Sequence, residues 1–446
     1  MLKTNRFIKT LILILIITIS SCQKKEPIVI TSDHFHNSIE KVMEIMVHDI
    51  FSPPVASRIF VYPNIAAYEI VALKNDKYKS LKNQITDFKG IPEPENPENI
   101  NFELSALIAH MELSKKLIFS EAKMESFSDS LYLEWEDKNK TVFESSKNYA
   151  LKVSRHFSKW MDEDNYKQTR TMSKYSINTE DISKWQPTPP AYMDGIEPHW
   201  NKIRTMVIDS ASQFIPAPPP KFSMEEGSDF YKEVKEVYDI SNKITEEGDD
   251  SEEIQIAQFW DCNPYVSVTR GHLMFATKKT TPGAHWIGIT RIASKKSNYD
   301  VAETLNAYTV TSIALFDAFI SCWDEKYRSN LVRPETLINI HFNDNWKPIL
   351  QTPPFPEYTS GHSVISNAAS IALTDIFGEN FQFDDDTELA YGLPVRSFDS
   401  FKDAAAEATI SRMYGGIHYR VAVEVGATQG IDLGNYVINN IQTINE

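Results

Sequence analysis

The sequence predicts an all-α protein built from helical bundles. Apolar residues recur at three- and four-residue steps through most of the chain, which is the period of an amphipathic helix. Runs that alternate apolar and polar residues, as half-buried strands do, are few, and there is no internal repeat. The 446 residues are 42% apolar and 24% charged, a globular composition with room for two packed bundles.

Helices are expected in both halves of the chain, separated by proline-rich loops. The first helix ends at Ser52-Pro53-Pro54, because proline cannot donate the helical hydrogen bond. The stretch from Pro216 to Lys221 divides an N-terminal helical subdomain, residues 34–216, from a C-terminal helical domain, residues 217–446. The expected helices cover residues 39–50, 56–73, 101–119, 121–135, 142–161, 229–245, 251–262, 300–325, 362–377, 402–414 and 418–441.

The N-terminus predicts export and lipid anchoring. Residues 1–9 are basic, and Leu11 to Ile19 form an apolar core too short to span a bilayer. The segment Ile19-Ser20-Ser21-Cys22 resembles a bacterial lipobox, in which the chain is cut before the cysteine and the cysteine is diacylated. We therefore expect a lipoprotein signal peptide at 1–21, a tether at 22–33, and a protein held at the bacterial cell envelope through Cys22.

The chain is strongly acidic, with a formal net charge of −16. Such a body repels nucleic acid at long range, so we expect no nucleic-acid partner and place any anion site in a local basic pocket. The acidic segments Glu246 to Glu253 and Asp384 to Asp386 lack a calcium-binding loop and are expected to be solvated charge. Cys262 and Cys322 lie in separate apolar contexts, which leaves both a disulfide and two buried thiols open.

A loop-to-helix junction at residues 355–362 carries the first chemical signal. A proline-rich loop ends at Ser360-Gly361-His362, and apolar residues follow at helical spacing. Ser360 is expected to cap the helix, so backbone N–H groups and the positive end of the helix dipole lie beside an imidazole. These features predict an oxyanion site, although a capping serine beside a surface histidine gives the same short sequence.

Two further segments supply charge. Arg333 follows Lys326 by seven residues, and the proline after Arg333 places that arginine at an element end, where it can turn inward. Arg412 and His418 are six residues apart and would point away from each other on one helix. Gly415-Gly416 can break that helix and let the two side chains converge. Taken singly, Lys326 and Arg333 are of the kind usually found on a solvated helix face, and a helix–turn–helix corner explains Arg412 and His418 equally well.

Together the three segments describe a site for a tetrahedral, multiply charged oxyanion. Cations would offset its charge, hydroxyl and amide donors would hold its oxygens, and two histidines would lie on the reaction axis. The candidate residues are Lys326, Arg333, Ser360, Gly361, His362, Arg412 and His418.

The order and spacing of these residues resemble a three-part family signature. The parts are Lys326-x6-Arg333-Pro334, Ser360-Gly361-His362 and Ser411-Arg412-x5-His418. They are similar to the signature of the type 2 phosphatidic acid phosphatase and vanadium-dependent haloperoxidase superfamily, over roughly the last third of the chain. The resemblance implies a helical-bundle core with the anion at one end.

The resemblance also implies a role for each residue. Lys326, Arg333, Ser360, Gly361 and Arg412 would bind the oxyanion, His362 would be the acid–base histidine, and His418 would be the axial ligand of vanadate or the nucleophile that takes a phosphoryl group. Two positions depart from the family pattern. Thr359 replaces a proline, and Ala422 replaces the aspartate that would hold the tautomer of the last histidine, so another acceptor must do this or His418 is less well tuned.

The surroundings of the site favour the haloperoxidase branch. Trp323 and Phe355 match an aromatic pair that resembles the halide region of those enzymes, with Phe355 nearer the chloride-type pattern. No apolar run after Cys22 is long enough to span a membrane, and the segment from Asp49 to Glu69 resembles the N-terminal region of bacterial haloperoxidase-like proteins. The leading hypothesis is a lipid-anchored haloperoxidase that uses vanadate, hydrogen peroxide and halide.

Two alternatives stay open at this point. The first is an acid phosphatase with His418 as nucleophile and no vanadium. The second is a non-catalytic envelope lipoprotein that binds phosphate, which the alanine at position 422 motivates.

Overall fold

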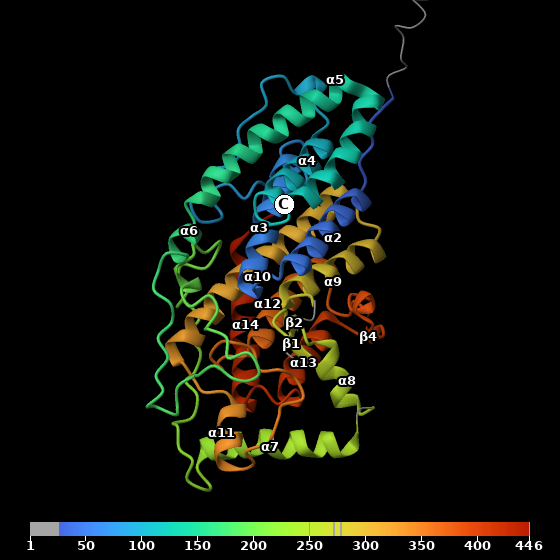
Figure 1. Ribbon diagram of the computed structural model, residues 1–446. Helices are drawn as coiled ribbons and strands as arrows, with labels where there is room; N and C mark the ends of the chain where they lie inside the picture. The colour runs from blue at the N-terminus through green and yellow to red at the C-terminus, as the bar shows by residue number, and fades with distance from the viewer. Residues whose placement is uncertain (1–25, 249, 271–272, 277–278, 446) are drawn as a thin grey trace, which may run out of the picture.

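The computed structural model describes residues 26–248, 250–270, 273–276 and 279–445 (Figure 1). The expected signal peptide and Cys22 lie outside these residues. The described chain is mostly helical, as the sequence predicts, with two short antiparallel hairpins. The α-helices are α2 (Ser32–Asp49), α3 (Pro53–Ala72), α4 (Phe102–Lys115), α5 (Glu121–Asp162), α6 (Tyr166–Thr169), α7 (Asp229–Glu247), α8 (Glu252–Phe259), α9 (Pro282–Lys296), α10 (Val301–Ser329), α11 (Pro334–His341), α12 (Gly361–Phe377), α13 (Phe401–Tyr414) and α14 (Arg420–Asn440), and the strands are β1 (Ser267–Arg270), β2 (Leu273–Ala276), β3 (Phe383–Asp385) and β4 (Arg396–Phe398).

Helix α10 forms the centre of the molecule and packs against α3, α9, α12 and α14. Among the described residues it is the helix long and apolar enough to cross a membrane, but the apolar stretch is wholly buried inside the protein. The sequence predicts a helix at 300–325 but no membrane-spanning run, because polar residues such as Asn306, Thr309 and Thr311 interrupt the apolar stretch. Its neighbours enclose those polar side chains as well.

Helices α12 and α14 run side by side in the same direction, as Figure 1 shows. Three glycines of α14 lie at four-residue spacing along α12: an added Cβ at Gly426 would meet the Ser360 carbonyl, and one at Gly430 would come within 2.3 Å of the Val364 carbonyl. Gly434 approaches Ala368 in the same way. This backbone-to-backbone packing brings the N-termini of both helices to one place, where two positive dipole ends meet.

The C-terminus returns to the N-terminal half. Ile444 bridges Tyr78, the Thr443 carbonyl accepts from the Lys79 amide at 2.8 Å, and the Asn445 amide donates to the Lys77 carbonyl at 2.9 Å. One continuous apolar core includes residues from both sides of position 216. Because this core does not divide at position 216, the expected boundary between residues 34–216 and 217–446 stays a prediction.

Several elements differ from the sequence-based expectation. Helix α9 was not predicted because it is buried nearly all round, with His285, Trp286 and Thr290 inside, so it has no amphipathic stripe. The predicted helices 121–135 and 142–161 are confirmed as the two arms of α5, which meet at the non-helical Asn139. Helix α2 begins at Ser32, within the expected tether, because Thr31 forms a capping box with His34 in place of the usual Glu or Gln.

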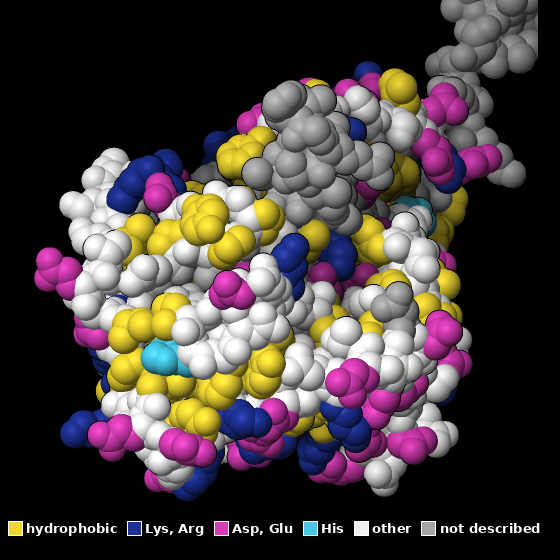
Figure 2. Space-filling view, turned by 60° about the horizontal axis from the view of Figure 1, so that its bottom comes forward, with side chains coloured by type: hydrophobic (Ala, Val, Ile, Leu, Met, Phe, Trp, Pro, Cys, Tyr) yellow, Lys and Arg dark blue, Asp and Glu magenta, His cyan; other side chains and the backbone are white. Residues whose placement is uncertain are grey.

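Acidic and basic side chains are interspersed over the face shown in Figure 2, with hydrophobic side chains between them. No block of one sign covers that face. The clustered cations predicted from the sequence lie inside the protein instead, since Lys326, Arg333 and Arg412 are each no more than 1% exposed. Binding of an anion would therefore take place in an enclosed site.

Candidate oxyanion site

Three connections bring the predicted segments together: the one between α10 and α11, the loop before α12, and the one between α13 and α14. The left-handed Asn330 ends α10, and Arg333 in extended conformation caps α11 ahead of Pro334. Ser360 caps α12 and its hydroxyl accepts from the Ser363 amide. Gly416, with a φ of 75°, separates α13 from α14, as the glycine pair predicted. Each connection places a polar side chain at the same end of the bundle.

Arg333 joins the loop before α12 to the start of α14. Its Nε donates to the Phe355 carbonyl at 3.0 Å, and its Nη1 lies 2.9 Å from the Ile417 carbonyl and 3.1 Å from Nε2 of His418. Nη2 has no hydrogen-bond partner among the described residues. Burial lowers the pKa of Arg333 to about 10, so the guanidinium stays charged at neutral pH and offers one free edge.

Lys326 donates its hydrogen bonds to the loop before α12. Its Nζ donates to the carbonyls of Pro356, Glu357 and Thr359, at 3.2, 3.0 and 2.5 Å. An ammonium has three N–H groups, so all of them are used. Burial, and then Arg333, lower the pKa of Lys326 to about 8. In this geometry Lys326 acts on an anion through its charge and by holding the loop.

The start of α12 supplies donors and an imidazole. The Ser360 amide donates to the Ala422 carbonyl, which fixes α12 to α14. Gly361 is the first helical residue, and an added Cβ there would contact Trp323 and Lys326 at 3.7 and 3.8 Å. Nε2 of His362 is buried without a hydrogen-bond partner among the described residues. Burial, and then Arg412, hold the pKa of His362 well below its ordinary value, so the ring is neutral.

Arg412 reaches the site from the end of α13. Its Nη1 donates to the Trp260 carbonyl at 2.8 Å, and its Nη2 lies 3.9 Å from Oδ1 of Asp261. Its Nε has no hydrogen-bond partner among the described residues. The chain after α8, at residues 260–262, therefore positions a cation of the site. The sequence did not point to this segment, because the contact uses a backbone carbonyl.

Glu357 takes the place of the aspartate that is missing at Ala422. Its Oε1 lies 2.7 Å from Nδ1 of His418 and also accepts from the Tyr419 amide at 3.0 Å. Arg333 donates to Nε2, so His418 carries its proton on Nδ1 and donates it to Glu357. This fixes the ring with its Nε2 lone pair directed toward the cations. Glu357 lies five residues before His362, in a loop, where helical periodicity carries no information about which histidine a carboxylate will contact.

A small cavity of about 30 Å³ lies at this junction. Of the predicted residues, Trp323, Phe355, Gly361, His362, Arg412 and His418 line it, whereas Lys326, Arg333 and Ser360 lie behind its wall. The ring centres of Trp323 and Phe355 are 5.1 Å apart. The Lys326 ammonium is 5.0 Å from the centre of the Phe355 ring and 5.8 Å from that of Trp323. The aromatic pair therefore contacts the cations directly.

The residues present fit a tetrahedral oxyanion such as vanadate. Buried charged donors that lack partners are costly, and this site holds two of them, Arg333 Nη2 and Arg412 Nε, beside the unpartnered His362 Nε2. The N-termini of α12 and α14 add backbone N–H groups and positive dipole ends. His418 would hold vanadium through Nε2, and Arg333, Arg412, Ser360 and Gly361 would surround its oxygens.

The remaining site predictions have different outcomes. Cys262 and Cys322 are both free and buried, so no disulfide joins them. The expectation that Asp384 to Asp386 are solvated is wrong for Asp385, which is fully buried and bonded to His285. The alternation of strand β3 turns Asp385 inward while Asp384 stays exposed. The roles inferred for Lys326, Arg333, Ser360, Gly361, His362, Arg412, His418, Trp323 and Phe355 stay predictions that the geometry accommodates.

Fold and site together define a helical-bundle protein with an enclosed oxyanion site. Residues 341–446 match the family of the VCPO second helical-bundle domain. A solved structure described as the first bacterial vanadium-dependent iodoperoxidase is 65% identical, with a TM-score of 0.92 over 95% of this chain and 100% of that chain. The chain belongs to the vanadium-dependent haloperoxidases.

Two more distant structures share the fold. The holo form of a bacterial vanadium-dependent chloroperoxidase is 16% identical, with a TM-score of 0.62 over 88% of this chain and 93% of that one. Its apo form is 15% identical, with a TM-score of 0.63 over 90% and 97%. No curated protein matches the chain in sequence.

Proposed function

We propose that this protein oxidises iodide with hydrogen peroxide at a vanadate held by His418 and the surrounding cations. The observation that carries the proposal is the set of buried donors without partners around the Nε2 of His418. The 65% identical iodoperoxidase structure supports iodide as the halide. When bound, vanadate supplies the Lewis acid that activates peroxide toward halide.

The chain's own residues would prepare the site for that chemistry. Arg333 and Arg412 neutralise the anion, and Lys326 adds positive charge without giving up its loop carbonyls. His362 is neutral, and its buried Nε2 can hold or deliver a proton at the cavity wall. The rings of Trp323 and Phe355 exclude water from the side of the cavity where a halide would approach.

The test is reconstitution of purified protein with vanadate. Iodide, bromide and chloride are each supplied with peroxide, and triiodide formation or halogenation of a dione is followed. We expect turnover with iodide that requires vanadate and is lost in His418→Ala. Hydrolysis of an aryl phosphate, inhibited by vanadate and lost in the same variant, with no halide oxidation, would instead establish a phosphatase.

We propose that the mature protein is anchored at the cell envelope through a lipid on Cys22. The basic start, the short apolar core and the lipobox-like Ile19-Ser20-Ser21-Cys22 support this proposal. The full-length chain expressed in a bacterium should take up labelled fatty acid and partition into detergent. Cys22→Ser should lose the label, whereas Cys322→Ser should keep it; a label that survives Cys22→Ser contradicts the anchor.

A further inference from the structure

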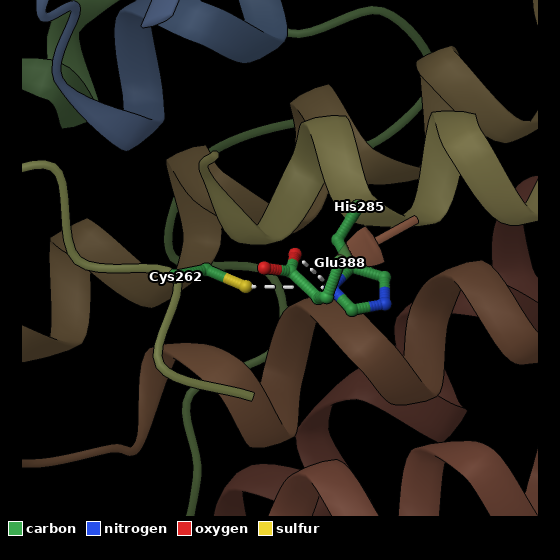
Figure 3. A group of neighbouring side chains, drawn as sticks. All are labelled: Cys262, His285 and Glu388. Atoms are coloured by element: carbon green, nitrogen blue, oxygen red, sulfur yellow. Dashed lines mark hydrogen bonds and ion pairs between the residues drawn. The ribbon is translucent and has the colours of Figure 1, made fainter. Parts of the chain in front are cut away.

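A second buried group of side chains lies beside the oxyanion site (Figure 3). Cys262 follows α8, His285 comes from α9, and Glu388 comes from the loop after β3. The Cys262 Sγ lies 3.5 Å from His285 Nδ1, and Glu388 Oε1 lies 3.2 Å from the same nitrogen. Figure 3 shows the thiol and the carboxylate on the Nδ1 side of the ring. All three residues are buried.

His285 is oriented so that Nδ1 faces Cys262 and Glu388. Its other nitrogen, Nε2, lies 2.8 Å from Oδ2 of Asp385 and 2.9 Å from the Thr387 hydroxyl. With the Nε2 proton donated to Asp385, Nδ1 is the nitrogen left to bind an ion, once the ion has displaced the proton that Nδ1 carries in the ionised pair. Asp385 is fixed in turn, because its Oδ1 accepts from the amide and hydroxyl of Thr387 at 3.0 and 2.7 Å. A carboxylate behind a histidine is the support that metal-binding imidazoles commonly have.

Two of the three spacings among the ligand atoms match a tetrahedral zinc site. With Zn–S near 2.3 Å and Zn–N and Zn–O near 2.0–2.1 Å, tetrahedral angles put sulfur and nitrogen about 3.5 Å apart and nitrogen and oxygen about 3.3 Å apart. The observed distances are 3.5 Å and 3.2 Å, and all three ligand atoms lie within 4.8 Å of one another. Thiolate, imidazole and carboxylate are ligands that zinc prefers.

Glu388 is a buried carboxylate with few partners. The residue is 3% exposed, and among the described residues its Oε1 accepts no hydrogen bond but forms an ion pair with His285 Nδ1 at 3.2 Å. A cation bound by Cys262, His285 and Glu388 would replace that ion pair with a closer contact to the carboxylate. His285 also lines a separate cavity of about 740 Å³, with Thr387 and Tyr391, which gives an ion or a water a path to the site.

We propose that Cys262, His285 and Glu388 bind a divalent zinc-type cation. Binding displaces two protons to solvent, one from the Cys262 thiol and one from His285 Nδ1, and leaves a fourth position for water. The site is joined to the oxyanion site through Trp260, whose ring stacks on His285 at 4.5 Å and whose carbonyl accepts from Arg412. A bound ion would therefore fix the segment that positions Arg412.

The test uses full-length, vanadate-free protein that has been stripped with a chelator. One sample is titrated with Zn²⁺ and a separate sample with Co²⁺. We expect one tight ion per chain and, with Co²⁺, the charge-transfer band of a thiolate ligand. Cys262→Ser should abolish the band and weaken Zn²⁺ binding by about 100-fold. Glu388→Gln, which keeps the shape of the side chain, should weaken binding by about tenfold and guards against misfolding of the cysteine variant.

Cys322→Ser is the matched control, because Cys322 is also a free buried thiol but donates to the Thr359 carbonyl, at 3.8 Å, and lies outside the Cys262–His285–Glu388 group. It should keep both the stoichiometry and the band. Absence of a tight ion in the unmodified protein would overturn the proposal, as would a Co²⁺ band that survives Cys262→Ser. None of these readouts depends on haloperoxidase activity, so the two proposals fail separately.

Discussion

The molecule contains two buried histidine–carboxylate pairs with nearly equal geometry and opposite charge states. His418 lies 2.7 Å from Glu357, and His285 lies 2.8 Å from Asp385. Burial, Arg333 and Lys326 hold the pKa of His418 well below its ordinary value, and burial raises the pKa of Glu357 to about 8. The first pair is therefore neutral at pH 7.

The second pair is ionised. Burial alone would lower the pKa of His285, but Asp385 and Cys262 raise it well above its ordinary value. Burial would raise the pKa of Asp385, but His285 and Thr387 hold it low. The difference lies in the neighbours, because cations surround His418 and carboxylates surround His285. A neutral His418 pair leaves the positive charge of the cations uncompensated and available to an incoming oxyanion.

The largest effect is expected from Arg333→Ala. It removes three hydrogen bonds that join the Phe355 loop to His418, and it leaves the neutral pair without its nearest cation. Because three buried acceptors lose their donor, we expect a loss of about 3–5 kcal/mol in the free energy of unfolding. Vanadate binding, measured by calorimetry on whatever protein folds, should fall by at least about 100-fold.

Arg420→Ala is the control for Arg333, since Arg420 is 39% exposed and pairs with Glu236 and Glu424 at the surface. It should cost less than about 1 kcal/mol and leave vanadate binding unchanged. Similar losses in both variants would mean that the Arg333 effect is not specific to the enclosed site.

Asp385→Asn should be the next largest change, because it removes a real charge from the ionised pair. The loss includes the partner of His285 Nε2, and we expect about 3 kcal/mol of destabilisation in chelator-treated protein at pH 6. Asp384→Asn on the same strand touches only the Ser397 hydroxyl and should stay within about 0.5 kcal/mol of the unmodified protein. Urea unfolding measures both, and equal values would show that the His285 pair is not ionised.

The sequence predicted the oxyanion site better than it predicted the pairs behind it. The helix start at Ser360, the element end at Arg333 and the glycine break at Gly416 follow from local rules of capping and φ, so the charged residues could be placed at element ends. Glu357 and Asp385 act across long sequence separations, and only tertiary packing decides which buried histidine each one meets.

The same reason explains the missed α9. A helix enclosed on every side has no polar face, and periodicity in the sequence therefore carries no signal for it. His285 was overlooked with its helix, and the acidic run around Asp385 was taken for surface. Patterns with a solvent-facing side could be recognised, whereas fully buried polar groups could not.

A smaller effect is expected from Phe355→Leu. The Phe355 ring lies 5.0 Å from the Lys326 ammonium and 5.1 Å from the Arg333 guanidinium, so it stabilises the cations that keep the His418 pair neutral. Leucine keeps most of the apolar volume but has no π face, and we expect about 1–2 kcal/mol of destabilisation. Phe319→Leu is the control, because Phe319 lines the same cavity beside Trp323 at 5.5 Å. Equal losses in thermal unfolding would mean that only packing matters.

The smallest effect is expected from Glu357→Gln, and it separates the two pairs most directly. A protonated Glu357 and a glutamine have the same shape and charge, and both can accept from His418 Nδ1 and the Tyr419 amide. At pH 6 the variant should therefore lose no more than about 1 kcal/mol of stability and bind vanadate within about threefold of the unmodified protein. Glu357→Ala, which leaves Nδ1–H unpaired, should bind about 10- to 100-fold more weakly.

The pH dependence of the free energy of unfolding shows whether Glu357 is protonated in the folded protein. The pKa of Glu357 is raised from 4.5 to about 8, so between these values the folded protein binds a proton that the unfolded chain has released. The free energy of unfolding of the unmodified protein must then fall, relative to that of the glutamine variant, as the pH rises from 5 to 8. If this difference instead grew with pH, or if Glu357→Gln cost as much at pH 6 as Asp385→Asn, Glu357 would be ionised and the two pairs would be alike.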